Sequence, residues 1–204
     1  MTSEVVITSR PDAAALAALY RDLHRNPELS YAETRTAGIV AASLTSLGYE
    51  VATGIGRTGV VGVLRRGEGP TVLVRGDMDA LPVQEESGLD YASIARGTDP
   101  NGTDVAVMHA CGHDVHVTCL VGAAAELAAD DSWAGTLMVI AQPAEELGTG
   151  ARAMVADGIF ERFGRPDVVL GQHVGPMPAG MIGLHPGAAF ATSDSIKVTL
   201  YGRG

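Results

Sequence analysis

The stretch "GTLMVIAQPAEE", residues 135–146, joins a strongly apolar strand-like run to a polar end and indicates the fold class. Similar apolar runs occur at residues 71–77 ("TVLVRGD") and 166–174 ("PDVVLGQHV"), and residues 115–129 and 150–163 between them have helical character. Strands that alternate with helices predict an α/β domain whose sheet is mostly parallel and is flanked by helices.

The residues before this region predict further elements of the same domain. Residues 11–25 are rich in Ala and Leu and predict a helix. Ser30 and Glu33 match the S-x-x-E capping box, so we expect a second helix to begin behind them and to end at Gly48. The strand-like pieces at 49–53, 59–66 and 71–77 suggest a hairpin or sheet.

Two other segments carry weaker signals. Residues 54–59, "GIGRTG", match the G-x-G-x-x-G pattern of dinucleotide-binding loops. A strand-like run follows them instead of a helix, so we expect no such site. Residues 84–107 are polar and rich in turn formers, and we expect a loop there.

Composition excludes several classes of protein. The chain has 204 residues, a hydrophobic fraction of 46% and a formal net charge of −10, which opposes nucleic-acid binding. No apolar run reaches the roughly 20 residues of a membrane span. The first residues have no secretory signal, and the two cysteines make no disulfide framework, so we expect a cytoplasmic location.

Reactive side chains follow the ends of the predicted strands. Asp77 ends the run at 71–77 and Asp79 follows it, Glu145 and Glu146 follow the run at 135–143, and His173 lies near the end of the run at 166–174. Ligands bind open α/β sheets in the crevice beyond the carboxyl ends of the strands. Taken singly, these residues are also consistent with solvated helix starts, loop caps or a buried histidine.

The segment "HACGHDVH", residues 109–116, supports three interpretations. A structural zinc knuckle is disfavoured because the chain has no C-x-x-C pair. A Cys111 nucleophile with a histidine base stays open. A metal site in which Cys111 and His113 are joined by Glu146 and His173 explains more of the chain, and a helix N-terminus just behind would favour the Cys111 thiolate.

Five ordered motifs resemble one known family, the metal-dependent aminoacylase/carboxypeptidase-type amidohydrolases, which include hippurate hydrolases, auxin-conjugate amidohydrolases and N-acyl-amino-acid deacetylases. The motifs are "LHRNPELSYAETRTA" (23–37), "RGDMDALPVQEE" (75–86), "MHACGHDVHVT" (108–118), "QPAEELGTGARAM" (142–154) and "GQHV" (171–174). The loop at 92–112 looks a few residues longer than in the family, which would reshape the mouth of the pocket.

The resemblance implies a hydrolase that holds two divalent metal ions (Zn²⁺, Mn²⁺, Co²⁺ or Ni²⁺) and cleaves N-acyl amino acids or short peptides. It places Cys111, His113, Glu146 and His173 on the metal ligands and Glu145 on the general base. Asp79 falls on a residue that supports a ligand histidine, and Asp77 replaces a histidine of the larger clan. It also implies a homo-oligomer for the full-length form.

The resemblance further implies that the chain covers the N-terminal half of such an enzyme. We expect residues 1–192 to form the N-terminal part of the catalytic domain. Residues 193–204 would be the first strand of an incomplete α+β domain for lid formation and dimerisation. Two alternatives to an active hydrolase stay open: a truncated, non-catalytic metal-binding fragment, and a Cys111-dependent hydrolase.

Overall fold

The computed structural model describes residues 4–188, 196 and 198–202. It divides into two units, Met1–Val174 and Gly175–Gly204. The described residues of the second unit form neither helix nor strand. Part of the strand expected at 193–204 lies outside the described residues, so the domain boundary at residue 193 stays a prediction. Among the described helices, none is long and apolar enough to cross a membrane.

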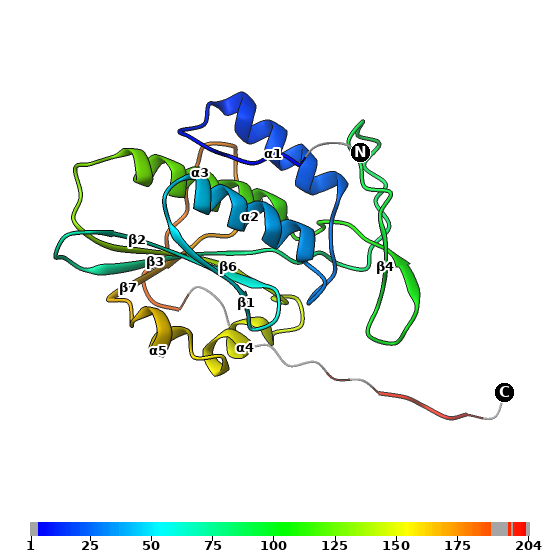
Figure 1. Cartoon of the computed structure of the whole chain (residues 1–204). Coiled ribbons are helices and arrows are strands. Elements are labelled where there is room, and N and C mark those ends of the chain that lie inside the picture. Colours follow the sequence, from blue (N-terminus) through cyan, green and yellow to red (C-terminus); the bar gives the residue numbers. More distant parts are fainter. Residues whose placement is uncertain (1–3, 189–195, 197, 203–204) are drawn as a thin grey trace. The chain divides into compact units, whose positions relative to one another are not determined.

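The first unit contains a five-stranded sheet (Figure 1), which confirms the predicted fold class. Its strand order is β1-β2-β6-β3-β7. β2 is antiparallel to both of its neighbours, and β6, β3 and β7 pair in parallel, so four of the five strands run in one direction. The strands are β1 (Glu50–Ile55), β2 (Gly59–Arg66), β3 (Thr71–Asp77), β6 (Gly135–Gln142) and β7 (Val168–Gly171).

Helices cover both faces of this sheet (Figure 1). The longer helices lie on one face and the two short ones on the other. The first group is α1 (Ala13–Arg25), α2 (Thr34–Ser46) and α3 (His113–Ala129); the second is α4 (Gly150–Ala156) and α5 (Ile159–Phe163). A strand covered on both faces needs apolar side chains in both directions, which explains the continuous hydrophobic runs of the sequence.

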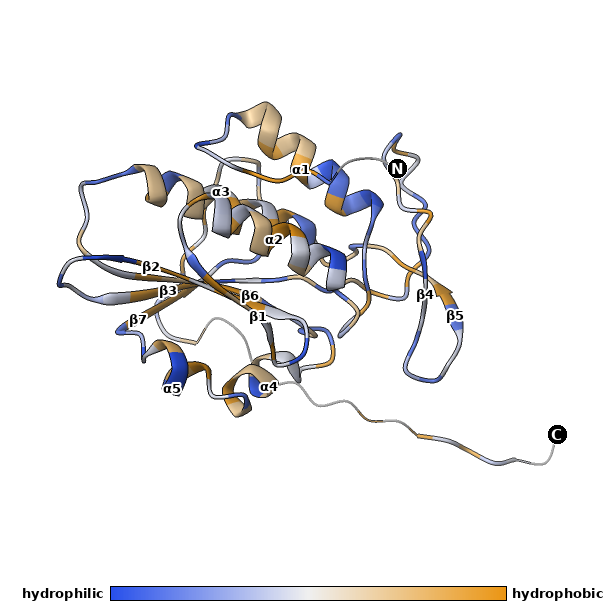
Figure 2. Cartoon of the chain, in the orientation of Figure 1, coloured by the Kyte–Doolittle hydropathy of each residue, from blue (hydrophilic) through white to orange (hydrophobic). Residues whose placement is uncertain are grey.

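Alternation along β6 divides the core between the two faces. Leu137, Val139 and Ala141 pack in the cluster beneath α1–α3, whereas Met138 and Ile140 pack in the cluster on the α4–α5 face. Successive side chains of a strand point to opposite faces, so this single run supplies both clusters. Figure 2 shows hydrophobic colouring along the central strands.

The strand connections differ in part from the sequence-based expectation. β1 and β2 form the suggested hairpin, and the G-x-G-x-x-G segment is its turn. β3 does not pair with β2, because β6 lies between them. The pairing of β3 with β6 joins residues that are 65 positions apart in the chain, with Thr71 opposite Thr136. Local sequence patterns do not encode such an insertion.

Two other expectations were wrong. Residues 84–107 are not only loop, since β4 (Arg96–Thr98) pairs antiparallel with β5 (Asp104–Ala106). The S-x-x-E motif is not a capping box, because α2 begins at Thr34 without a side-chain cap. Ser30 and Glu33 instead hydrogen-bond to distant segments that carry the candidate site.

Candidate metal centre

The candidate site lies at the edge of the sheet where the parallel neighbours β6, β3 and β7 end. The segments that follow these strands carry Glu145 and Glu146, Asp79, and His173 respectively. The strand order therefore brings together three sequence segments that were predicted to meet at this edge. In open α/β sheets this edge is where ligands bind.

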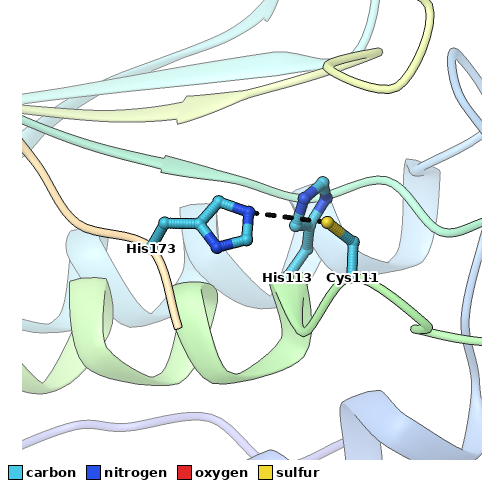
Figure 3. A group of neighbouring side chains, drawn as sticks. All are labelled: Cys111, His113 and His173. Atoms are coloured by element: carbon cyan, nitrogen blue, oxygen red, sulfur yellow. Dashed lines mark hydrogen bonds between the residues drawn. The ribbon is translucent and has the colours of Figure 1, made fainter. Parts of the chain in front are cut away.

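The turn before α3 brings Cys111 to the same place. Gly112 takes a left-handed conformation (φ +78°), and α3 begins at His113 directly after it. Cys111 Sγ lies 3.5 Å from His173 Nε2, and Figure 3 shows both side chains beside His113. Single ligand atoms of these three residues all lie within 4.8 Å of one another.

His113 lies at the centre of a cluster of carboxylates in this site. Its Nδ1 lies 2.7 Å from the backbone oxygen of Asp79; a carbonyl only accepts, so Nδ1 carries the proton. Its Nε2 lies 3.8 Å from Glu145 Oε2, 3.8 Å from Glu146 Oε1 and 3.7 Å from Asp77 Oδ2. These separations are too long for hydrogen bonds.

The same separations fit a shared cation. Two N or O ligands bound to one ion at 2.0–2.2 Å lie about 3.4 Å apart in tetrahedral geometry and at most ~4.4 Å apart. A tetrahedral S and N pair lies about 3.6 Å apart, close to the Cys111–His173 distance of 3.5 Å. His113 Nε2 and Glu146 Oε1 are buried and have no hydrogen-bond partner among the described residues. The donor set therefore fits a divalent ion such as Zn²⁺.

Asp79 supports the site through different atoms from those expected. Its carbonyl, not its carboxylate, makes the short contact to His113; the nearer carboxylate oxygen is 3.4 Å away. The carboxylate instead accepts the backbone N–H groups of Glu145 and Glu146, each at 3.0 Å, and the hydroxyl of Ser30 at 2.6 Å. Burial opposes ionisation of Asp79, but the neighbouring His113 and these hydrogen bonds lower its pKa. Asp79 thus orients both the histidine and the Glu–Glu segment.

Asp77 is fully buried and engaged by two side chains. Its Oδ1 lies 2.5 Å from His116 Nδ1, and its Oδ2 lies 2.7 Å from Arg75 Nη1. Burial would raise the pKa of Asp77, but the hydrogen bond from His116 and the charges of His113 and Arg75 lower it to about 2. Asp77 is therefore a carboxylate at neutral pH.

The electrostatics around Cys111 differ from the expectation of a thiolate. Burial, together with the negative charges of Glu146, Glu145 and Asp77, raises the pKa of the Cys111 thiol to about 11. In the metal-free site burial and the surrounding carboxylates therefore outweigh the helix N-terminus. The thiol becomes a good ligand only where a cation compensates for those carboxylates.

Residues that were not predicted as site residues hold the start of the Glu145–Glu146 segment in place. Ala144 precedes Glu145 and has a φ of +45°, a conformation that non-glycine residues rarely adopt. Its N–H donates to Glu33 Oε1 at 2.8 Å, and the Glu33 carboxylate also accepts the Thr58 hydroxyl. Glu33 is fully buried. In the sequence Glu33 belongs to the motif at 23–37 and to the S-x-x-E pattern, which indicated a helix cap instead.

Of the remaining polar residues of the 109–116 segment, His116 forms a third candidate ligand group with Asp77 and His113, whereas Asp114 and His109 lie outside these groups. Asp114 Oδ2 lies 2.6 Å from His24 Nδ1 and so ties the start of α3 to α1, while His24 Nε2 lies 3.1 Å from Glu85. His109 is buried without a hydrogen-bond partner among the described residues, and burial lowers its pKa to about 4.

The chain belongs to peptidase family M20/M25/M40, whose model matches residues 73–204. Among its relatives, hippurate hydrolase of Campylobacter jejuni is 46% identical over 186 residues, which are 89% of this chain and 45% of that protein. Thermostable carboxypeptidase 2 of Saccharolobus solfataricus is 42% identical over 190 residues, 90% of this chain and 45% of that protein. The expected family resemblance is confirmed.

Solved structures agree with this assignment. The YXEP protein of Bacillus subtilis, described as a dinuclear metal-binding peptidase, is 34% identical with a TM-score of 0.70. The match covers 80% of this chain and 43% of that one. The chain thus spans less than half the length of each of these three relatives.

Proposed function

We propose that this chain forms the metal-binding catalytic unit of a metal-dependent amidohydrolase that cleaves N-acyl amino acids or short peptides. The observation that carries the proposal is the convergence of three strand-end segments and one helix start around His113. Their free N, O and S atoms are spaced as ligands of shared ions would be. Membership of the family and the names of the relatives support the reaction class.

The ligand assignment follows the sequence-based prediction. We propose that Cys111, His113, Glu146 and His173 hold two divalent ions, drawn from Zn²⁺, Mn²⁺, Co²⁺ and Ni²⁺. A soft thiolate among imidazole and carboxylate ligands is compatible with several of these, so availability would decide between them. YXEP, described as dinuclear, supports the number of ions.

Glu145 is proposed as the general base. Its side chain is 39% exposed, twice the 19% of Glu146, so it can reach a water while its neighbour faces the ligands. Divalent ions in such sites supply Lewis acidity and lower the pKa of water toward ~7. Glu145 would accept the proton of the attacking water and return it to the leaving nitrogen, as a general base does when its role reverses.

A cavity beside Glu146 suits the acyl side of such a substrate. Its volume is about 690 Å³. Apolar side chains make much of its wall: Leu29, Ala80, Leu81, Pro82 and Leu147. At the same cavity the Arg57 guanidinium lies 4.2 Å from the centre of the Tyr31 ring. Thr98 at the end of β4 and residues 99–100 of the β4–β5 turn also line the cavity. The longer loop noted in the sequence therefore reaches this cavity.

The nucleophilic role of Cys111 is less well supported. A thiol whose pKa is raised to about 11 is almost entirely protonated at neutral pH, whereas cysteine nucleophiles need a lowered pKa or a paired base. His173 lies near enough to be that base, at 3.5 Å. The surrounding carboxylates oppose the thiolate, and this favours the metal site.

Metal analysis and a hydrolysis assay on the same preparation test the proposal. We expect calorimetric titration with Mn²⁺ or Zn²⁺ to show two bound ions. In an active form of the protein, the loaded sample should release glycine from hippurate. Metal binding without hydrolysis of any N-acyl amino acid would favour the non-catalytic fragment. Hydrolysis that survives complete metal removal would contradict the metal mechanism.

A cytoplasmic location, a homo-oligomeric full-length form and a boundary near residue 193 belong to the same proposal. The family resemblance supports the second and the third. Cell fractionation would measure the location, light scattering the oligomeric state, and limited proteolysis the domain boundary.

A further inference from the structure

His116 contacts the candidate site without belonging to the predicted ligands. It lies on α3, three residues after His113, and is completely buried. Its ring centroid lies 4.5 Å from that of His173 and 5.2 Å from that of His113. Both of its ring nitrogens have partners: Nδ1 contacts Asp77 at 2.5 Å, and Nε2 contacts the backbone nitrogen of Val174 at 2.9 Å.

These two partners fix the tautomer of His116. A backbone N–H can only donate, so Nε2 must accept with its lone pair and cannot carry a proton. Nδ1 then carries the single proton and donates it to the Asp77 carboxylate. Arg75 holds the other oxygen of Asp77, and Arg75 Nε also donates to Gln142 Oε1 at 2.9 Å. The hydrogen bonds therefore run from the Val174 N–H through His116 to the Asp77 carboxylate at the end of β3.

The peptide units around Val174 connect His116 to His173. His116 accepts the Val174 N–H, and His173 Nδ1 donates to the Val174 carbonyl at 2.7 Å. His173 therefore keeps its Nε2 lone pair free, and that atom faces Cys111 Sγ. Val174 also packs close to the turn before α3, where a Cβ at Gly112 would lie 2.5 Å from Val174 Cγ2.

The segment that carries His173 has few other attachments. The pairing of β7 with β3 ends with Gly171 opposite Arg75. Beyond the β3–β7 ladder, and within the described part of the chain, the hydrogen bonds that join residues 172–174 to the rest of the domain are those to His116 and Cys111. His173 itself is exposed, so packing alone does not fix its ring.

We propose that His116 is a positioning residue: the Asp77–His116 pair holds the Val174 peptide group and thereby directs the His173 imidazole toward Cys111 and His113. The inference rests on the proposed metal site. It also gives Asp77 a role, because its Oδ1 orients His116. Partners that orient a metal ligand in this way typically contribute 10–100-fold to metal affinity.

Two substitutions separate the two hydrogen bonds of His116. In His116→Asn, the amide nitrogen can still donate to Asp77, but no acceptor reaches Val174. In His116→Gln, the longer side chain can place its oxygen near the position of Nε2 and accept the Val174 N–H. Cys119→Ala is a matched control, because Cys119 lies on α3 three residues further along and is exposed.

The measurements are calorimetric titration with Mn²⁺ or Zn²⁺ and ¹⁵N NMR of the histidine rings in the metal-free 204-residue chain. We expect NMR to show His116 as the neutral Nδ1–H tautomer. We expect His116→Asn to weaken metal binding by at least 10-fold, His116→Gln to recover most of that loss, and Cys119→Ala to bind as the unaltered chain does. Circular dichroism checks that each variant is folded.

The results separate this inference from the proposed function. An Nε2–H or doubly protonated His116 at neutral pH would overturn the positioning role, even if a variant failed to fold. So would a folded His116→Asn that binds metal like the unaltered chain, or equal losses in the Asn and Gln variants. If the unaltered chain binds neither ion, the proposed metal site itself fails and the positioning role falls with it.

Discussion

The carboxylate of Asp79 accepts the backbone N–H of Glu145 at 3.0 Å, and this hydrogen bond joins the end of β3 to the segment after β6. Its second oxygen accepts the N–H of Glu146 in the same way. The proposed base and the proposed ligand are therefore held by one buried carboxylate.

Asp79→Asn should loosen this segment. An amide offers one acceptor oxygen and turns an NH₂ group toward the other N–H, which leaves a buried donor unsatisfied and costs about 1–3 kcal/mol of unfolding free energy. Urea denaturation measures that loss. Ser30→Ala, which removes only the hydroxyl bound to Asp79, should cost less, about 1 kcal/mol. Equal losses in the two variants would argue against the special role of the backbone contacts.

Glu145→Gln and Cys111→Ala should separate catalysis from metal binding. The first removes the proposed base, so in a full-length protein we expect activity to fall by at least ~100-fold while the metal content stays nearly unchanged. The second removes a proposed ligand, so we expect the bound metal to be lost as well. Elemental analysis measures the bound metal of both variants, and a hydrolysis assay measures their activity. Metal loss from Glu145→Gln would place Glu145 among the ligands, and a metal-loaded but inactive Cys111→Ala would restore the nucleophile hypothesis.

Asp77 should make the stability of the metal-free chain depend on acidity. Its pKa is about 2 in the folded chain, below the ordinary value of 3.8. A lowered pKa stabilises the fold above pH ~4, and this contribution is lost as the pH falls toward 2. The shift corresponds to about 2 kcal/mol. The free energies of unfolding of the unaltered chain and of Asp77→Asn, measured with urea, should therefore differ most at neutral pH. The difference should shrink by about 2 kcal/mol toward pH 2. A difference independent of pH would contradict the assignment.

Gly56 should be intolerant of a side chain because α4 approaches it closely. A Cβ there would lie 2.6 Å from the backbone nitrogen of Met154, and the residue has a φ of +60°. Gly67 is a matched control, since its φ is +69° with nothing within 4 Å of an added Cβ. Gly67→Ala should cost only the conformational strain, about 1–2 kcal/mol. Gly56→Ala should cost at least ~1 kcal/mol more, and similar melting temperatures for both would refute the close approach.

The sequence predicted the sheet edge better than the contacts that shape it. Apolar runs that end in Asp79, Glu145 and His173 indicate parallel strands with reactive ends, and the structure brings those ends together. Periodicity carries this information because each strand must be apolar where it is buried. The insertion of β6 between β2 and β3 has no such local signal, because it depends on which distant strand pairs with which.

Side-chain roles were less predictable than positions. Ser30 and Glu33 match a local capping motif, yet each binds a residue more than 20 positions away in the chain. A short polar pattern has the same sequence whether its partners are near or distant. Likewise, the sequence indicated that Asp79 supports a histidine, but only the structure shows that its carbonyl makes the contact.

The proposed ligands lie far apart along the chain, with about 30 residues between the Cys111–His113 turn and Glu146 and a similar number from there to His173. An ion that joins them would close two loops whose ends are free in the unfolded chain, so metal binding and folding should be thermodynamically linked. The metal concentration then becomes a determinant of how long the folded chain survives. Depletion of divalent ions would hasten its unfolding and degradation before any substrate is encountered.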